Sequence, residues 1–88
     1  MEMIYLIKKE VVSIAIEKLL DVNSYIDADS VGMIENELNT AINDGYLDLD
    51  NLCEIISDTF QKHIQIPNEH TTIVNNYLKS KLSKELES

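Results

Sequence analysis

The sequence predicts a single all-α domain, a compact four-helix bundle with short loops that spans residues 1–88. Apolar residues recur at helical spacing in four separate segments, and the whole chain holds only two Gly and one Pro to interrupt them. With 44% hydrophobic and 26% charged residues, the composition is that of a globular protein. A chain of this length forms one domain with a modest core.

The first helix is expected from about residue 3 to residue 20. Its apolar positions at helical spacing are Ile4, Ile7, Val11, Ile14, Ala15 and Leu19. However, residues 11–16 are rich in β-branched side chains, which also fit strands, and residues 3–7 are apolar on all sides. A buried strand within residues 1–16 is therefore kept as an alternative to helix there.

The second helix should begin after residues 27–30, because short polar side chains can accept hydrogen bonds from the first helical turn. Its apolar stripe consists of Val31, Ile34, Leu38, Ala41 and Ile42. Gly45 is placed to adopt the left-handed conformation that ends many helices. Residues 43–47 are accordingly expected to form a loop.

The third helix has the most regular pattern, with Asp48 or Asp50 as the capping residue and Pro67 as the stop signal. Its apolar positions are Leu49, Leu52, Cys53, Ile56, Phe60 and Ile64. Phe60 should contribute the most to the core. A fourth helix is expected to start within residues 68–72, with the apolar positions Ile73, Val74, Tyr77, Leu78, Leu82 and Leu86.

The net charge of -9 is concentrated in the middle of the chain. Residues 19–61 contain ten acids and no base, whereas the segments on either side are close to neutral. The acid excess argues against direct binding to nucleic acid or to an anionic membrane surface. A single cysteine, no signal peptide pattern and no membrane-length apolar run together suggest a cytoplasmic protein.

Three acids on the third helix follow one another at i, i+4 and i+8, so they share one edge of that helix. Because residues 19–61 contain no lysine, we expect these charges to face water, a cation or a basic partner. The candidate partner-binding residues are Glu35, Glu37, Asp44, Asp48, Asp50, Glu54 and Asp58. The alternative is a solvated helix face that only keeps the protein soluble.

Residues 40–51 resemble a decayed EF-hand loop, because Asp44-Gly45-Tyr46-Leu47-Asp48 is similar to the core around that loop's glycine. If Gly45 holds the sixth position, Ile42 and Asn51 hold the third and twelfth, where calcium requires oxygen ligands and a bidentate glutamate. Tight calcium binding is therefore not expected. The resemblance leaves one alternative, an EF-hand-like adaptor with a groove lined by residues such as Met33 and Leu38.

Cys53, His63 and His70 have a spacing that matches no common zinc site. Cys53 falls on the apolar face and should be a small buried hydrophobe, while His70 should be exposed in a first helical turn. The chain has no arginine and no glycine-rich phosphate loop. We therefore expect no metal, no cofactor and no enzymatic activity.

These observations favour a small acidic binding protein whose middle segment engages a basic partner protein. In size and acidity the chain resembles toxin-immunity proteins and phage-encoded inhibitors of host defence nucleases. That resemblance implies an inhibitor or immunity protein of a nucleic-acid-acting enzyme, or a phage counter-defence factor. The main alternative is a helical structural or regulatory subunit that assembles through apolar contacts, for example as a homodimer.

Overall fold

The computed structural model describes residues 3–87, without the side chains of Ile4 and residues 85–87. Over this range the chain forms four helices and one two-stranded sheet. The elements in order are β1 (Met3–Leu6), α1 (Lys8–Val22), α2 (Ala28–Ala41), β2 (Gly45–Asp48), α3 (Leu49–His63) and α4 (Asn68–Glu87). The predicted four-helix, all-α fold is therefore confirmed, with a small sheet added to it.

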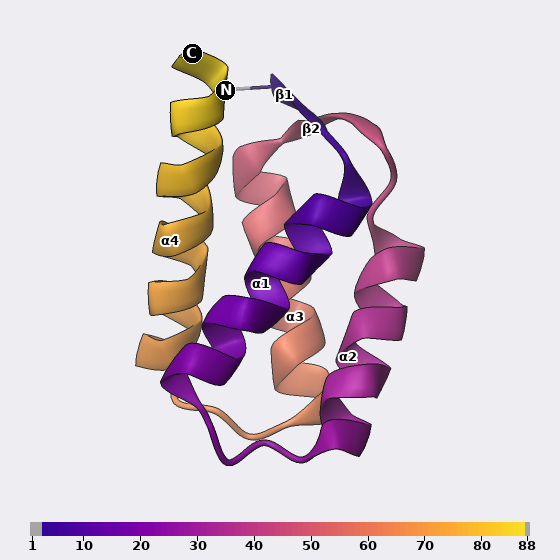
Figure 1. The fold of residues 1–88 in the computed structure, drawn as a ribbon, viewed down its shortest axis with the longest axis vertical. Coiled ribbons are helices and arrows are strands. Elements are labelled where there is room, and N and C mark those ends of the chain that lie inside the picture. Colours follow the sequence, from indigo (N-terminus) through magenta and orange to yellow (C-terminus); the bar gives the residue numbers. More distant parts are fainter. Residues whose placement is uncertain (1–2, 88) are drawn as a thin grey trace.

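The helices form two packed layers, with α1 crossing in front of α3 in the view of Figure 1 and with α2 and α4 on either side. Both α1 and α3 pack against α2 and against α4. The radius of gyration is 12.3 Å, close to the roughly 12 Å expected for a compact chain of this length. No helix within residues 3–87 has the length and apolar character needed to cross a bilayer.

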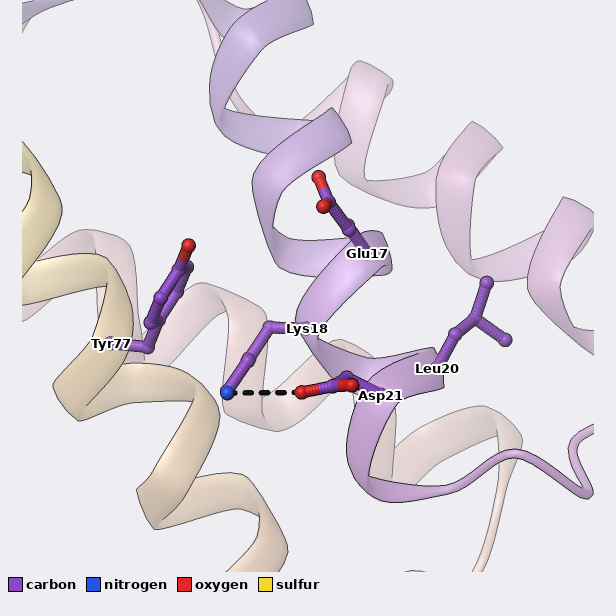
Figure 2. A pocket seen from close by; sticks show the side chains of 5 residues that line it. All are labelled: Glu17, Lys18, Leu20, Asp21 and Tyr77. Carbon is purple, nitrogen blue, oxygen red and sulfur yellow. Dashed lines mark hydrogen bonds and ion pairs between the residues drawn. The ribbon is translucent and has the colours of Figure 1, made fainter.

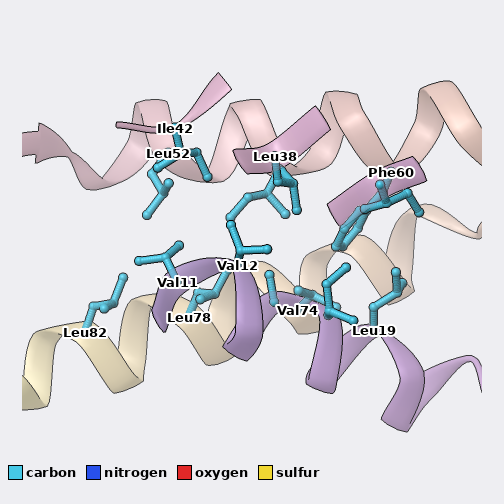
Figure 3. Close-up of a cluster of buried hydrophobic side chains, with 14 of the residues drawn as sticks. Val11, Val12, Leu19, Leu38, Ile42, Leu52, Phe60, Val74, Leu78 and Leu82 are labelled. Atoms are coloured by element: carbon cyan, nitrogen blue, oxygen red, sulfur yellow. The ribbon is translucent and has the colours of Figure 1, made fainter. Parts of the chain in front are cut away.

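The core consists of the apolar stripes that the periodicity predicts. Phe60 is the largest side chain that is fully buried, as expected, and side chains from all four helices converge around it (Figure 3). The predicted positions that are buried are Val11, Ala15, Leu19, Ile34, Leu38, Ile42, Leu49, Leu52, Cys53, Ile56, Phe60, Val74, Leu78 and Leu82. Ile7, Ala41, Ile73 and Tyr77 are exposed instead. The predictions for the side chains of Ile4 and Leu86 lie outside the described residues.

The start of the first predicted helix is wrong, because residues 3–6 form strand β1 and α1 begins only at Lys8. In a strand, side chains alternate between two faces, so Leu6 is buried while Tyr5 points to solvent. The alternative is therefore correct that residues 3–6 form a strand, but this strand is not buried as expected, since Met3 is exposed as well. By contrast, residues 11–16 are helical, because packing of this segment against the other helices overrides its β propensity.

The predicted loop at residues 43–47 is also partly wrong, because Gly45–Asp48 forms strand β2, antiparallel to β1. Helix α2 ends at Ala41, where the amide of Ile42 donates to the carbonyl of Leu38, so Gly45 does not terminate it. Gly45 has φ 130°, a conformation that L side chains rarely adopt, and its surroundings are open. The glycine is therefore required by the backbone turn into β2 and not by lack of space.

Candidate functional site

The seven acids predicted to bind a partner do not form one cluster. Glu35 and Glu37 lie two residues apart on α2, and two residues turn an α-helix by about 200°. Glu35 therefore lines a shallow cavity with residues of α1, whereas Glu37 faces α3. These two carboxylates cannot contact the same small surface on a partner.

The carboxylate of Glu37 is paired with side chains of α3 within the fold. Its Oε1 lies 3.3 Å from Nζ of Lys62 and 3.2 Å from Nε2 of His63, both on α3. Partial burial favours the neutral carboxyl, but the contacts with His63 and Lys62 outweigh burial and lower the pKa of Glu37. The expectation that this acid faces only water or an external partner is therefore wrong.

Asp50 is also paired, with its Oδ1 3.1 Å from Nζ of Lys79 on α4. The hydrogen bond from Lys79 to this carboxylate raises the pKa of the lysine. Because the side chain of Asp50 is 81% exposed, water and salt screen this ion pair, and exposed pairs of this kind stabilise a fold only weakly. A competing cation from a partner can replace Lys79 at small cost.

Asp44 has a structural contact, because its Oδ1 accepts a hydrogen bond of 2.8 Å from the backbone amide of Lys8. Lys8 is the first residue of α1, whose early amides lack helical acceptors and favour a nearby negative charge. The Nζ of Lys8 in turn donates to the carbonyl of Asn39 near the end of α2. Asp44 therefore joins the start of α1 to the end of α2.

Asp50, Glu54 and Asp58 lie along the outward side of α3, and we call these three residues the α3 edge. Each step of four residues turns the helix by about 40° and advances about 6 Å, so the row drifts from the α4 side toward the α2 side. Asp50 meets Lys79 at one end of the row, and Lys62, one turn beyond Asp58, meets Glu37. Glu54 and Asp58 are exposed and have no cation within ion-pair distance among the described side chains.

The strands carry a second surface, which the helical interpretation missed. Met3, Tyr5, Ile7 and Tyr46 are all exposed, and we call these four residues the tyrosine face. Tyr5 and Tyr46 are cross-strand neighbours with ring centroids 5.3 Å apart and planes at 78°. The signal available in the sequence was the short, continuous apolar run of residues 3–7, together with a tyrosine that directly follows a glycine at residues 45–46.

Asp48 borders the tyrosine face and connects it to the α3 edge. It follows Tyr46 by two residues on β2, so both side chains lie on the same face of the strand, and it pairs across the sheet with Met3. Asp48 also occupies the N-cap position of α3, as predicted, although its side chain makes no capping hydrogen bond. A row of acids thus runs from the edge of the tyrosine face onto α3.

Cys53, His63 and His70 lie in three different environments. Cys53 is buried, as expected, and burial raises the pKa of its thiol. His70 is half-buried and not exposed as predicted, because its Nδ1 lies 2.7 Å from Oδ1 of the fully buried Asn23. Within residues 3–84, whose side chains are described apart from Ile4, no three His, Cys, Asp or Glu residues are grouped as metal ligands would be.

In the segment that resembles an EF-hand loop, polar side chains that could serve as calcium ligands make hydrogen bonds within the fold instead. The hydroxyl of Thr40, at the first loop position, donates to the carbonyl of Asn36, and Asp44 accepts from Lys8. Leu38 belongs to the core whereas Met33 is exposed, so these two residues do not line one groove.

A shallow cavity of about 380 Å³ lies between α1 and α4 (Figure 2). Lys18 points into it, with its Nζ 3.1 Å from Oδ2 of Asp21 and 4.8 Å from the centre of the Tyr77 ring. Glu17 also lines the cavity, so its charges are mixed and its lysine is already paired. This cavity therefore has no charge preference that would select a ligand.

Comparison of the chain with protein-family models, with curated proteins and with solved structures found no match. The exposed α3 edge offers carboxylates, and the tyrosine face offers apolar area with two phenol groups. Both suit recognition of another macromolecule more than transformation of a small substrate.

Proposed function

We propose that this chain is a small, acidic, non-enzymatic protein-binding module that engages a basic partner through the α3 edge. The observation that carries the proposal is the pair Glu54 and Asp58, exposed on consecutive turns without a lysine partner among the described side chains. Among the other acids of the predicted set, Glu37, Asp44 and Asp50 form contacts within the fold. Glu35 lines a cavity beside α1, and Asp48 borders the tyrosine face.

Electrostatics gives this edge a preference for a positive partner. Like charges at i, i+4 destabilise a helix by about 0.2–0.5 kcal/mol for each pair. A lysine or arginine between them removes that repulsion, and complementary fields accelerate association and select against acidic competitors. A basic surface would therefore be attracted to Glu54 and Asp58 and would compete with Lys79 for Asp50.

A nucleic-acid-acting enzyme is the partner class that fits this edge best. Such an enzyme carries lysine and arginine where it binds phosphates, and a row of carboxylates can occupy the same positions. We therefore propose an inhibitor, an immunity protein or a phage counter-defence factor that acts on the enzyme and makes no direct contact with nucleic acid. The cytoplasm, where a lone cysteine such as Cys53 stays reduced, is the proposed location.

The experiment is affinity capture from the native host, followed by titration of the recovered partner. The test variant combines Glu54→Gln with Asp58→Asn, which removes two charges and keeps the side-chain size. The control combines Glu10→Gln with Glu17→Gln, two exposed acids about two turns apart on α1, so both variants have the same net charge. We expect a basic partner that binds the wild type and the control but binds the test variant at least about tenfold more weakly, a difference of about 1.4 kcal/mol.

Equal affinity of the test variant and the control would contradict the proposal, provided that both give the circular dichroism of the wild type. A recovered partner with an acidic binding surface would contradict it as well.

A second candidate function is a helical subunit that assembles through apolar contacts, and the exposed tyrosine face favours it. An exposed apolar patch of this kind marks an interaction site in many proteins. Sedimentation of the purified chain tests it, because self-assembly through this face predicts an average mass that rises with protein concentration. A mass that stays at 10.0 kDa would exclude homodimerisation in that range.

A further inference from the structure

The tyrosine face carries aromatic area that the rest of the fold leaves largely uncovered. Tyr5 is 61% exposed and Tyr46 is 72% exposed, although each ring contacts the other across the sheet. Among the described residues, the backbone hydrogen bonds of β1 and β2 join these two strands only to each other. The ribbon thus presents both an apolar face and open strand edges, which are features of a binding surface.

The charges around the tyrosine face indicate what covers it. Asp48 lies beside Met3 and Tyr46 at one end of the face, and Asp44 lies beside Gly45 at the other end. Lys8 lies nearby in the sequence, but its Nζ is turned toward the carbonyl of Asn39 on α2. In a dimer formed through this face, these acids would approach those of a second copy that also carries a net charge of -9. A basic partner avoids this repulsion.

We propose that the tyrosine face is the apolar centre of the interface with the basic partner, and that it binds an arginine-rich extended segment. This inference rests on the proposed function and adds the location and the chemistry of contact. Guanidinium groups stack on tyrosine rings and at the same time donate paired hydrogen bonds to a carboxylate. Tyr5 and Tyr46 supply the rings, and Asp48 supplies the carboxylate next to them.

The tyrosine face and the α3 edge meet at the junction of β2 and α3. Asp48 is the last residue of β2, and Asp50 lies in the first turn of α3. A partner that covers the tyrosine rings can therefore continue along Asp50 and Glu54 without a gap. This arrangement gives an apolar centre with a charged rim, which is the usual composition of a protein interface.

The experiment is an NMR titration of the full chain with a short, capped peptide of alternating arginine and valine. We expect the largest shift changes at Tyr5, Tyr46 and Asp48. Combining Tyr5→Thr with Tyr46→Thr should raise Kd about tenfold or more, because threonine keeps the β propensity and removes the rings. The control is Tyr25→Thr, which removes a tyrosine that is 79% exposed in the loop at the other end of the molecule (Figure 1) and should leave Kd within about twofold.

Each other outcome overturns the inference in a distinguishable way. Failure of the peptide to bind the wild type, or unchanged binding by the folded double tyrosine variant, removes the tyrosine face as the binding centre. If the captured partner still depends on Glu54 and Asp58, the proposed function survives that result. Equal binding of an alternating glutamate-valine peptide rejects the basic preference. Concentration-dependent self-association that the tyrosine substitutions abolish would show that a second copy covers the face.

Discussion

The two pairs of helices, α1 with α4 and α2 with α3, share one core but differ in charge. Each of α1 and α4 carries three lysines and three acids, whereas α2 carries three acids and no base, and α3 carries three acids and one lysine. The acid excess of the chain therefore lies on α2, on α3 and in the segments between helices.

Ion pairs between helices balance part of the acidic charge of α2 and α3. Lys79 of α4 reaches Asp50 of α3, and Lys62 of α3 reaches Glu37 of α2. A different kind of contact links α1 to α4, since Oδ1 of Asn23, just after α1, lies 2.7 Å from Nδ1 of His70 in the first turn of α4. Counting charges along the sequence thus locates the acidic half, and only the fold shows that Glu54 and Asp58 remain available on α3.

The largest expected effect is a loss of folding stability from a change in the core, which both helix pairs share. Phe60→Ala removes a fully buried ring and should destabilise the fold by about 3–5 kcal/mol. That loss is a large fraction of the roughly 5–15 kcal/mol typical of a domain. Urea denaturation followed by circular dichroism measures it, with Ile73→Ala as a partly exposed control that should change stability far less. A loss below about 1 kcal/mol for Phe60→Ala would contradict the packing described.

The next largest effect concerns the contact between Asn23 and His70, which links α1 to α4. Asn23→Ala should cost about 1–3 kcal/mol, because it leaves the ring nitrogen of the half-buried His70 without its partner. Tyr25→Phe is the control, since it removes only a longer contact of 3.3 Å to the same oxygen. Denaturation midpoints for the two variants should differ clearly. Equal midpoints would mean that the contact between Asn23 and His70 does not stabilise the pair of helices.

A smaller change, which stabilises the fold, is expected from a substitution on the α3 edge. Glu54→Lys converts two repulsive i, i+4 pairs into attractive ones and should stabilise the fold by about 0.4–1 kcal/mol for each pair, because the repulsion lost and the attraction gained are each about 0.2–0.5 kcal/mol. Glu54→Gln removes the repulsion without adding attraction, so it should stabilise the fold by about half as much. Thermal melts at low salt measure both gains, and added salt should shrink them. If Glu54→Lys destabilises the fold, the side chain of Glu54 makes a stabilising contact that outweighs its repulsion with Asp50 and Asp58.

The smallest effect is the acid dependence of the contact between α2 and α3. Because the folded pKa of Glu37 is lowered, its contribution is complete above the ordinary glutamate pKa and is lost as pH falls through the lowered value. Glu37→Gln should therefore remove part of the acid sensitivity of the wild type. Denaturation midpoints measured between neutral and strongly acidic pH test this. Parallel curves for the two proteins would show that Glu37 does not contribute.

The helical part of this fold was predictable because its signals are local. Each stripe, such as Leu52, Ile56 and Phe60, repeats within one helix and needs no knowledge of its neighbours. Strand β1 was foreseen only as an alternative to helix, and β2 was not predicted at all. Four residues are too few to establish a period of two, and the pairing joins segments about forty residues apart.

The candidate site was predictable to the same extent. The exposure of Glu54 and Asp58 follows from their positions on the polar side of one helix. The contacts that neutralise Glu37 and Asp50 depend on how helices cross, so the sequence alone does not reveal them. The tyrosine face depends on the same long-range pairing as the strands.

The most direct test of the central claim is the salt dependence of partner binding, measured as the slope of log Kd against log ionic strength. We predict a steep slope for the wild type and an equally steep slope for the Glu10→Gln, Glu17→Gln variant, because these two acids lie on α1 and not on the α3 edge. The Glu54→Gln, Asp58→Asn variant should have a shallower slope, since two contacts between opposite charges are lost. Equal slopes for the two variants would show that net charge, and not the α3 edge, attracts the partner.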